Sequence, residues 1–222
     1  MNLLDHQRAA PPSGAYGRLR DWIISGKLAP ETQVTEPGLA QMLGLSRTPV
    51  REALTILVSE GLMTRLPTGR VMVAAVSVEE IQRIYDVRSR LEGLIARDAS
   101  MRITPEDRSD LERQVVLMER LSDDYAEVVR IGKSFHQQLE YISRNLVCSS
   151  FLQQIRGHVD RYRVFTTQEP GRSFLVAAEH RGVFEAVVSG TPETAESVMR
   201  LHIDEAGKAA SDWARKWSAP ET

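Results

Sequence analysis

Three histidines in the second half of the chain have the chemistry to bind a metal ion. His136, His180 and His202 each lie among apolar residues. Imidazole binds zinc, nickel and similar divalent ions, and three such ligands leave coordination positions open for solvent or a bound molecule. No two of these histidines are close in sequence, so their spacing alone favours separate, hydrogen-bonded histidines. A metal site requires a fold that brings them together.

Two arginines in the first quarter of the chain have the chemistry to read DNA. Arg47 and Arg51 are four residues apart, and Thr48 comes three residues before Arg51. On a helix these side chains share one surface. Arginine can bind guanine O6 and N7 with two hydrogen bonds, and a hydroxyl can bind phosphate. An isolated pair of this kind is more often a solvated helix face, so the surrounding elements must decide.

The elements around these arginines indicate a winged helix-turn-helix. Helices are expected at about residues 15–25, 35–43 and 46–59, with Gly26, Gly44 and Gly61 after their ends. Short strands are expected at 62–65 and 71–74, joined by a turn at 67–69. In this motif the N-terminal end of the second helix of the helix-turn-helix enters the major groove. Arg47 and Arg51 lie at that end.

The rest of the chain reads as helical, and we expect a mainly α protein. Beyond residue 76 the pattern predicts a six-helix antiparallel bundle, which can direct side chains from separate helices to one interior point. The expected domains are a flexible arm at 1–13, a winged helix-turn-helix at 14–76 and an all-helical domain at 77–218. The expected helices of the last domain lie at about 78–101, 105–121, 123–145, 148–166, 172–189 and 192–217.

Composition is that of an ordinary soluble globular protein. The 222 residues are 42% hydrophobic and 26% charged, with one cysteine and a net charge of −2. No apolar run has the length of a membrane span, and the N-terminus lacks the apolar stretch of a signal peptide. We therefore expect a cytoplasmic protein without a membrane partner. Residues 1–76 carry a net charge of +2 and the remainder −4, which permits a DNA-facing N-terminal module.

The N-terminal module resembles the GntR family of bacterial regulators. The strings that carry this resemblance run from Leu39 to Leu54, including Ser46-Arg47-Thr48-Pro49-Val50-Arg51-Glu52-Ala53-Leu54, and continue at Glu60-Gly61-Leu62. The resemblance implies operator contacts from Ser46, Arg47, Thr48 and Arg51 and, at the wing, from Thr68, Gly69 and Arg70. The sequence departs from the family at Pro37 and Gly38, where relatives often carry a basic residue that meets DNA.

The helical module resembles the FCD effector domain of the FadR branch, and its six helices resemble the VanR-type subgroup. The matching residues are Tyr85-Asp86-Val87-Arg88, Leu91-Glu92, Phe135-His136, Glu179-His180 and His202. The resemblance implies that His136, His180 and His202 bind a divalent metal, with zinc as the first candidate. Its fourth ligand, an Asp, falls on Gly132. Either three neutral histidines hold the metal and water or an effector carboxylate fills the gap, or no metal binds and Gly132 enlarges an effector pocket.

Arginines of the helical module are candidates to bind an anionic effector. Arg88 can clamp an anion, or it can pair with Glu92 four residues later on the same helix. Arg161 and Arg163 can also reach a pocket, and their periodicity does not decide which one faces inward. The expected effector-binding set is Arg88, Gly132 and Arg161.

The function expected from these features is a DNA-binding transcriptional regulator, not an enzyme. A homodimer would read a palindromic operator, and a small carboxylate-type metabolite would release the repressor from it. A second hypothesis is a metal-sensing regulator. A third is a metal-dependent hydrolase fused to a DNA-binding module, but the sequence contains no HExxH, GxSxG or phosphate-binding loop.

Overall fold

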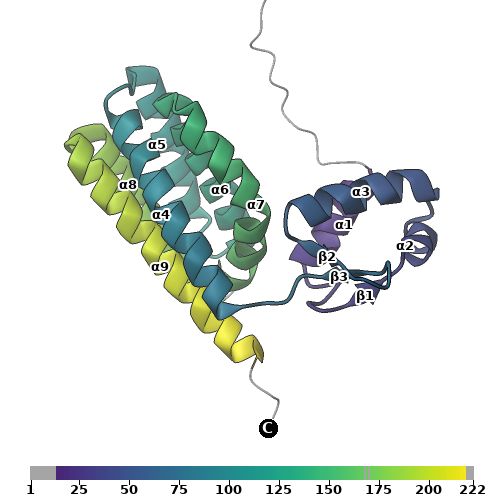
Figure 1. The fold of residues 1–222 in the computed structure, drawn as a ribbon. Helices are drawn as coiled ribbons and strands as arrows, with labels where there is room; N and C mark the ends of the chain where they lie inside the picture. The colour runs from purple at the N-terminus through teal and green to yellow at the C-terminus, as the bar shows by residue number, and fades with distance from the viewer. Residues whose placement is uncertain (1–13, 168, 170, 219–222) are drawn as a thin grey trace, which may run out of the picture. The chain divides into compact units, whose positions relative to one another are not determined.

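The computed structural model describes residues 14–167, 169 and 171–218, and its chain divides into two compact units after Ala75 (Figure 1). The arm expected at residues 1–13 lies outside the described residues. Within the described part, no helix is both long and apolar enough to span a membrane. Each unit has its own apolar core and is described separately below.

The first unit consists of three helices and a small sheet. The helices are α1 (Ala15–Ile24), α2 (Glu36–Leu43) and α3 (Arg47–Ser59). Thr35 begins α2, since its side chain accepts a hydrogen bond from the backbone N–H of Gly38. Gly44 ends the same helix with φ of 66°, a left-handed conformation that glycine adopts without a steric cost. Both ends of α2 are therefore fixed by local chemistry.

The sheet of the first unit forms the wing. Strands β1 (Gln33–Val34), β2 (Met63–Arg65) and β3 (Val71–Val73) are antiparallel in the order β1-β3-β2. In the register of β2 and β3, Met63 pairs with Val73. The predicted hairpin is confirmed, whereas β1 was not anticipated. Two residues are too short a run to show the alternation that marks a strand.

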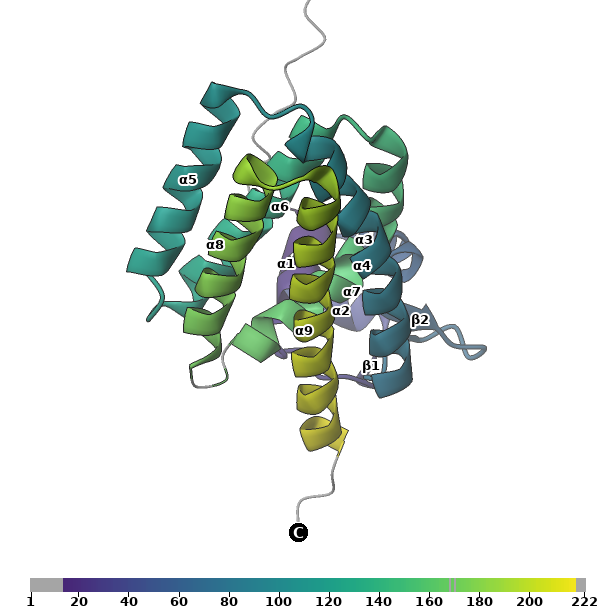
Figure 2. The ribbon, with the colours of Figure 1, turned by 90° about the vertical axis from the view of Figure 1, so that its left-hand side faces the viewer.

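The second unit is a bundle of six helices within the described residues, as predicted (Figure 2). Their bounds are α4 (Val78–Ser100), α5 (Pro105–Arg120), α6 (Tyr125–Ser143), α7 (Leu146–Thr167), α8 (Arg172–Ser189) and α9 (Pro192–Ser218). Helices α4 and α9 pack along each other (Figure 2). Gly207 permits their close approach, because a Cβ atom there would lie 2.9 Å from Cβ of Tyr85.

The interior of the second unit is mainly apolar, and several of its buried polar side chains form a cluster. Side chains such as Phe135, Leu139 and Ile203 are fully buried in its main core. Charged and polar side chains are also buried at the centre, and buried polar groups are stable only when partners satisfy them. The members of this cluster come from α4, α6, α8 and α9: Arg88, Glu92, His136, His180 and His202.

Candidate DNA-binding face and candidate metal centre

The N-terminal end of α3 presents a polar face. Ser46 is the N-cap residue, but its side chain makes no capping hydrogen bond. Ser46, Arg47, Thr48 and Arg51 are all exposed, whereas Val50, Leu54 and Leu57 of the same helix are buried in the core of the unit. The side chains implied by the family resemblance therefore lie on the outward surface of this helix.

A carboxylate from α2 joins the two arginines of α3. Oε1 of Glu36 accepts hydrogen bonds from Nε of Arg47 at 3.2 Å and from Nη2 of Arg51 at 2.9 Å. Nε of Arg51 donates to Oε2 at 3.0 Å. The hydrogen bond from Arg51 lowers the pKa of Glu36. No sequence pattern points to Glu36, because the three residues lie on two helices and share no helical spacing.

The wing tip is also exposed. Thr68, Gly69 and Arg70 occupy the turn between β2 and β3, where Gly69 has φ of 80°. A left-handed residue without a side chain lets such a turn approach a surface closely. Nη1 of Arg70 donates to Oε1 of Gln33 at 3.5 Å, so a side chain of the neighbouring strand β1 helps to orient this arginine.

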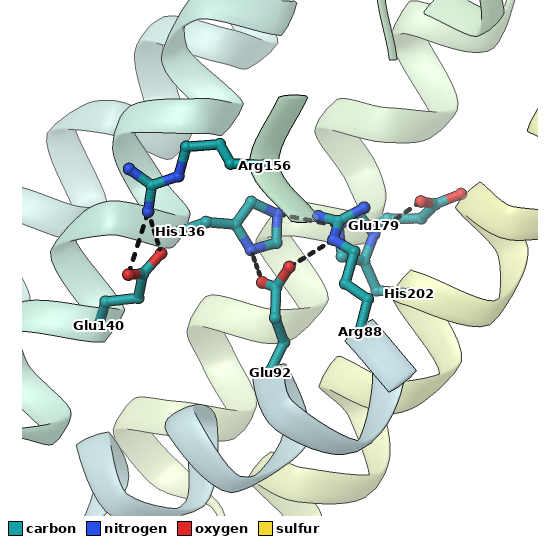
Figure 3. A network of polar contacts seen from close by, with 7 residues as sticks. All are labelled: Arg88, Glu92, His136, Glu140, Arg156, Glu179 and His202. Carbon is teal, nitrogen blue, oxygen red and sulfur yellow. Dashed lines mark hydrogen bonds and ion pairs between the residues drawn. The ribbon is translucent and has the colours of Figure 1, made fainter. Parts of the chain in front are cut away.

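The second unit brings the three distant histidines together. One ring nitrogen from each of His136, His180 and His202 lies within 4.8 Å of the other two. Nε2 of His136 is 3.3 Å from Nε2 of His202 (Figure 3). Nε2 of His180 is buried without a hydrogen-bond partner among the described residues. Helices α6, α8 and α9 supply these residues. The packing of the bundle therefore brings together three histidines that are far apart in sequence, where their spacing alone favoured independent histidines.

The opposite nitrogen of each ring contacts an acceptor. Nδ1 of His202 lies 2.8 Å from Oε2 of Glu179, and Nδ1 of His180 lies 2.7 Å from the carbonyl oxygen of Val176. Nδ1 of His136 contacts Oε2 of Glu92 (Figure 3). These acceptors favour a proton on each Nδ1, so each Nε2 carries its lone pair. A carboxylate or carbonyl behind an imidazole is the usual outer support of a metal-binding histidine.

Burial favours the neutral form of all three histidines. It lowers the pKa of His136 to about 4, even though Glu92 opposes this effect. Burial also lowers the pKa of His202, and it lowers that of His180 well below its usual value. A metal ligand must be unprotonated, so this pocket holds the rings in the form that binds a cation.

Gly132 lies directly beside this cluster. A Cβ atom at this position would lie 3.1 Å from Nε2 of His180. An Asp at this position would therefore fall within reach of the histidines, whereas glycine lets the ring of His180 lie close against the backbone. The donor set that remains is three imidazole nitrogens, which fits a zinc-like ion with an open coordination position.

A small, partly open cavity with a volume of about 30 Å³ adjoins the histidines, and the arginines among its described lining residues are Arg88, Arg163 and Arg172. Nε of Arg88 donates to Oε1 of Glu92 at 2.5 Å, so Arg88 pairs with Glu92 and lines the cavity at the same time (Figure 3). The other lining residues are Tyr85, Val128, Val129, Gly132, His136, Thr166, Thr167, Val176, His180, His202 and Ala206.

Arg161, expected among the effector ligands, lies elsewhere. It is buried, with its guanidinium carbon 5.8 Å from the ring centroid of Tyr162. Arg163 takes the cavity position instead. Positions i and i+2 on a helix are separated by roughly 200° of rotation, so Arg161 and Arg163 face different directions. Their order in sequence could not reveal which one pointed inward.

The charges of this cluster form a connected chain. Although burial alone would raise the pKa of Glu92, Arg88 and His136 hold it well below its usual value. Glu179 accepts hydrogen bonds from Arg172, and its pKa is lowered by His202 and Arg172 against the opposing effect of burial. Two arginines of the cavity thus pair with the carboxylates that support two histidines, which couples the cavity to the candidate metal centre.

Comparisons with known proteins agree with this architecture. The model of the FCD domain matches residues 83–205, and the model of bacterial regulatory proteins of the gntR family matches residues 12–73. The chain belongs to the GntR family and carries an FCD domain. It is therefore a transcriptional regulator rather than an enzyme, and its N-terminal helix-turn-helix domain is a DNA-binding domain.

Individual relatives cover most of the chain. An HTH-type transcriptional regulator of Streptomyces ambofaciens is 31% identical over 189 residues, which span 85% of this chain and 80% of the relative. The HTH-type transcriptional repressor RspR of Escherichia coli is 26% identical over 210 residues, covering 89% and 91%. The solved structure of E. coli McbR/YncC shares the fold, with a TM-score of 0.74, 18% identity and coverage of 92% and 97%.

Proposed function

We propose that this regulator is a repressor that a small carboxylate-type metabolite releases from a palindromic DNA operator. The observation that carries this proposal is the exposed Arg47 and Arg51 pair at the N-terminal end of α3, in a chain that also contains a small cavity lined in part by arginines. The RspR relative is named as a repressor, which supports the direction of regulation. Ser46, Thr48, Thr68, Gly69 and Arg70 supply further DNA contacts.

The effector binds in the cavity beside the three histidines. Arg88, Arg163 and Arg172 present positive charge to it, and arginine is suited to planar carboxylates. His136, His180 and His202 hold a divalent ion, zinc being the first candidate, whose open position would bind an effector carboxylate. That carboxylate takes the place of the family's Asp as a ligand. Binding shifts the protein between arrangements that fit and do not fit the operator.

The operator-bound form is a homodimer, since one winged helix-turn-helix reads one half-site of a palindrome. Exposed large apolar side chains of α4 and α7, together with Met101 just after α4, are candidates for contact with the second copy. Nδ2 of Asn145, just before α7, donates to Oδ2 of Asp98 on α4 at 2.8 Å, so these two helix ends lie next to each other. The candidates are Leu94, Met101, Leu146, Val147 and Phe151.

The test begins with selection of duplexes from a random-sequence pool by the purified wild-type chain. We call the enriched sequence the selected duplex. Fluorescence anisotropy then measures its release by a panel of mono- and dicarboxylates, and separately by a chelator. Release by a carboxylate while the metal stays bound supports the proposal. Release by metal removal, without any response to carboxylates, supports a metal sensor instead and contradicts effector control.

A further inference from the structure

We propose that Glu36 is a positioning residue that sets the base preference of this regulator by holding Arg51, and with it Arg47, in the orientation that reads guanine. This inference rests on the proposed DNA contacts of α3. It assigns a role to an acidic side chain on a surface that must approach phosphates. Glu36 lies in the first turn of α2, and its side chain is only 20% exposed.

The geometry of Arg51 leaves its reading edge free. The guanidinium donates through Nε at 3.0 Å and through Nη2 at 2.9 Å, so Glu36 binds its side edge with both carboxylate oxygens. A guanidinium has five N–H donors in one plane. The remaining donors include the pair on Nη1 and Nη2 that points along the side chain. That pair matches O6 and N7 of guanine.

Arg47 is held in the same manner but with one bond. Its Nε donates to Oε1 of Glu36 at 3.2 Å, which leaves both terminal nitrogens available. One carboxylate therefore joins two long side chains that would otherwise sample many rotamers. Ordering them before DNA arrives reduces the entropy lost on binding. The shared carboxylate also fixes the direction of each guanidinium. A fixed direction is important for hydrogen bonds to a base edge and less important for a contact with a phosphate.

Charge argues for the same role. Two arginines and one carboxylate leave a net positive charge of one on this surface, so Glu36 weakens general attraction to DNA. A residue that lowers non-specific affinity while ordering two base-reading side chains increases the difference between operator and random DNA. We therefore expect each half-site of the selected duplex to contain a guanine whose preference depends on Glu36.

The experiment compares the full-length wild type with Glu36→Gln, Glu36→Asp and a control, Glu52→Gln. Glu52 is an exposed carboxylate of α3, so its substitution removes the same charge nearby. Anisotropy gives dissociation constants for the selected duplex and for a random-sequence duplex of equal length. Thermal melting of each variant establishes that it is folded. Repeated selection with Glu36→Gln reports the base preference at each position.

The expected result is a loss of discrimination. Glu36→Gln should weaken binding to the selected duplex about tenfold, within the range of one good bidentate base contact, and relax the preference for guanine. Its binding to random DNA should stay equal or become tighter. Glu36→Asp keeps the charge but is too short to span both arginines, so it should also lower discrimination. Glu52→Gln should keep the wild-type ratio.

Two results overturn the role of Glu36 alone. Equal tightening on both duplexes by Glu36→Gln would mean that this carboxylate acts only as a repelling charge. Retention of the wild-type ratio by Glu36→Asp would mean that its geometry is not needed. If the wild-type chain enriches no sequence, both this inference and the proposed DNA contacts of α3 are overturned. This result therefore differs from the two above, which leave the DNA contacts of α3 in place.

Discussion

Nε2 of His136 faces Nε2 of His202 at 3.3 Å inside the helical unit. The Nδ1 atoms of both rings contact carboxylates, those of Glu92 and Glu179, which favours the tautomers that leave a lone pair on each Nε2. Two lone pairs at this separation repel each other unless a cation or a proton lies between them. The buried Nε2 of His180 completes the same centre. This arrangement is the strongest physical argument for a cation in the helical unit.

Removal of one of these ligands should abolish tight metal binding. We expect the wild-type protein to bind about one zinc ion per chain, and His180→Ala to lose most of that affinity, because two remaining imidazoles form an incomplete site. Isothermal titration and metal analysis measure both quantities. His158→Gln is the matched control, since His158 lies outside the cluster. Equal zinc binding by wild type and His180→Ala would contradict this assignment.

The carboxylate behind His202 should also affect metal affinity. Glu179→Gln weakens the acceptor at Nδ1 of His202 while preserving the shape of the side chain. Outer-shell changes of this type cost about 10- to 100-fold in metal affinity, and we expect a loss in that range. Titration with a competing chelator measures it. An unchanged affinity would show that Glu179 has only a structural role.

Gly132 should be the position where metal affinity can be increased. Gly132→Asp restores a carboxylate next to His180, and we expect at least about tenfold tighter zinc binding together with weaker effector binding. Gly132→Ala is the control for crowding, because its methyl group would meet Nε2 of His180 at 3.1 Å without adding a ligand. Thermal shifts with and without zinc compare the variants. If the Asp variant binds zinc no better than the Ala variant, the effector carboxylate does not occupy this place.

Arg163 should be required for the effector response. Burial lowers the pKa of its guanidinium, and Arg88 adds to this effect, so a bound anion would relieve an unfavourable environment. Arg163→Gln should retain DNA binding but lose the thermal shift produced by the active carboxylate. The control is Arg83→Gln, which changes an exposed arginine on α4. A full thermal shift in the Arg163 variant would place the anion elsewhere.

The two DNA-contacting elements should respond differently to substitution. Arg51→Ala should cost about 1–3 kcal/mol on the selected duplex and relax its base preference, as loss of a bidentate contact does. Arg70→Ala should weaken selected and random duplexes alike and reduce the salt slope by about one, as loss of a phosphate contact does. Anisotropy across a salt series separates the two. Identical behaviour of both variants would remove the distinction between reading helix and wing.

Local signals were sufficient to predict most of the fold. Thr35 and Gly44 mark the ends of α2 through hydrogen bonding and backbone conformation, and the structure agrees. Capping interactions at two helix starts of the second unit differ in completeness. The one at Thr104 and Asp107 is complete, whereas at Ser77 the side chain accepts from the backbone of Glu80. The short strand β1 was missed because it depends on pairing with β3 and not on its own pattern.

The candidate sites were harder to predict because their decisive contacts are tertiary. The histidines were found as residues, but their convergence follows from the packing of α6, α8 and α9. Nothing in sequence spacing distinguishes Arg161 from Arg163 when the direction of the helix is unknown. The contact of Glu36 with two arginines crosses from α2 to α3, and no periodicity reports such a contact.

The most direct test of the whole account is the affinity of the wild-type chain for the selected duplex relative to random DNA at physiological salt. We expect a palindromic selected sequence, bound at least about a thousandfold more tightly than random duplex, with a steep salt dependence. The active carboxylate should remove most of this preference. Failure to enrich any sequence, or equal affinity for both duplexes, would contradict the assignment of α3 as an operator-reading helix.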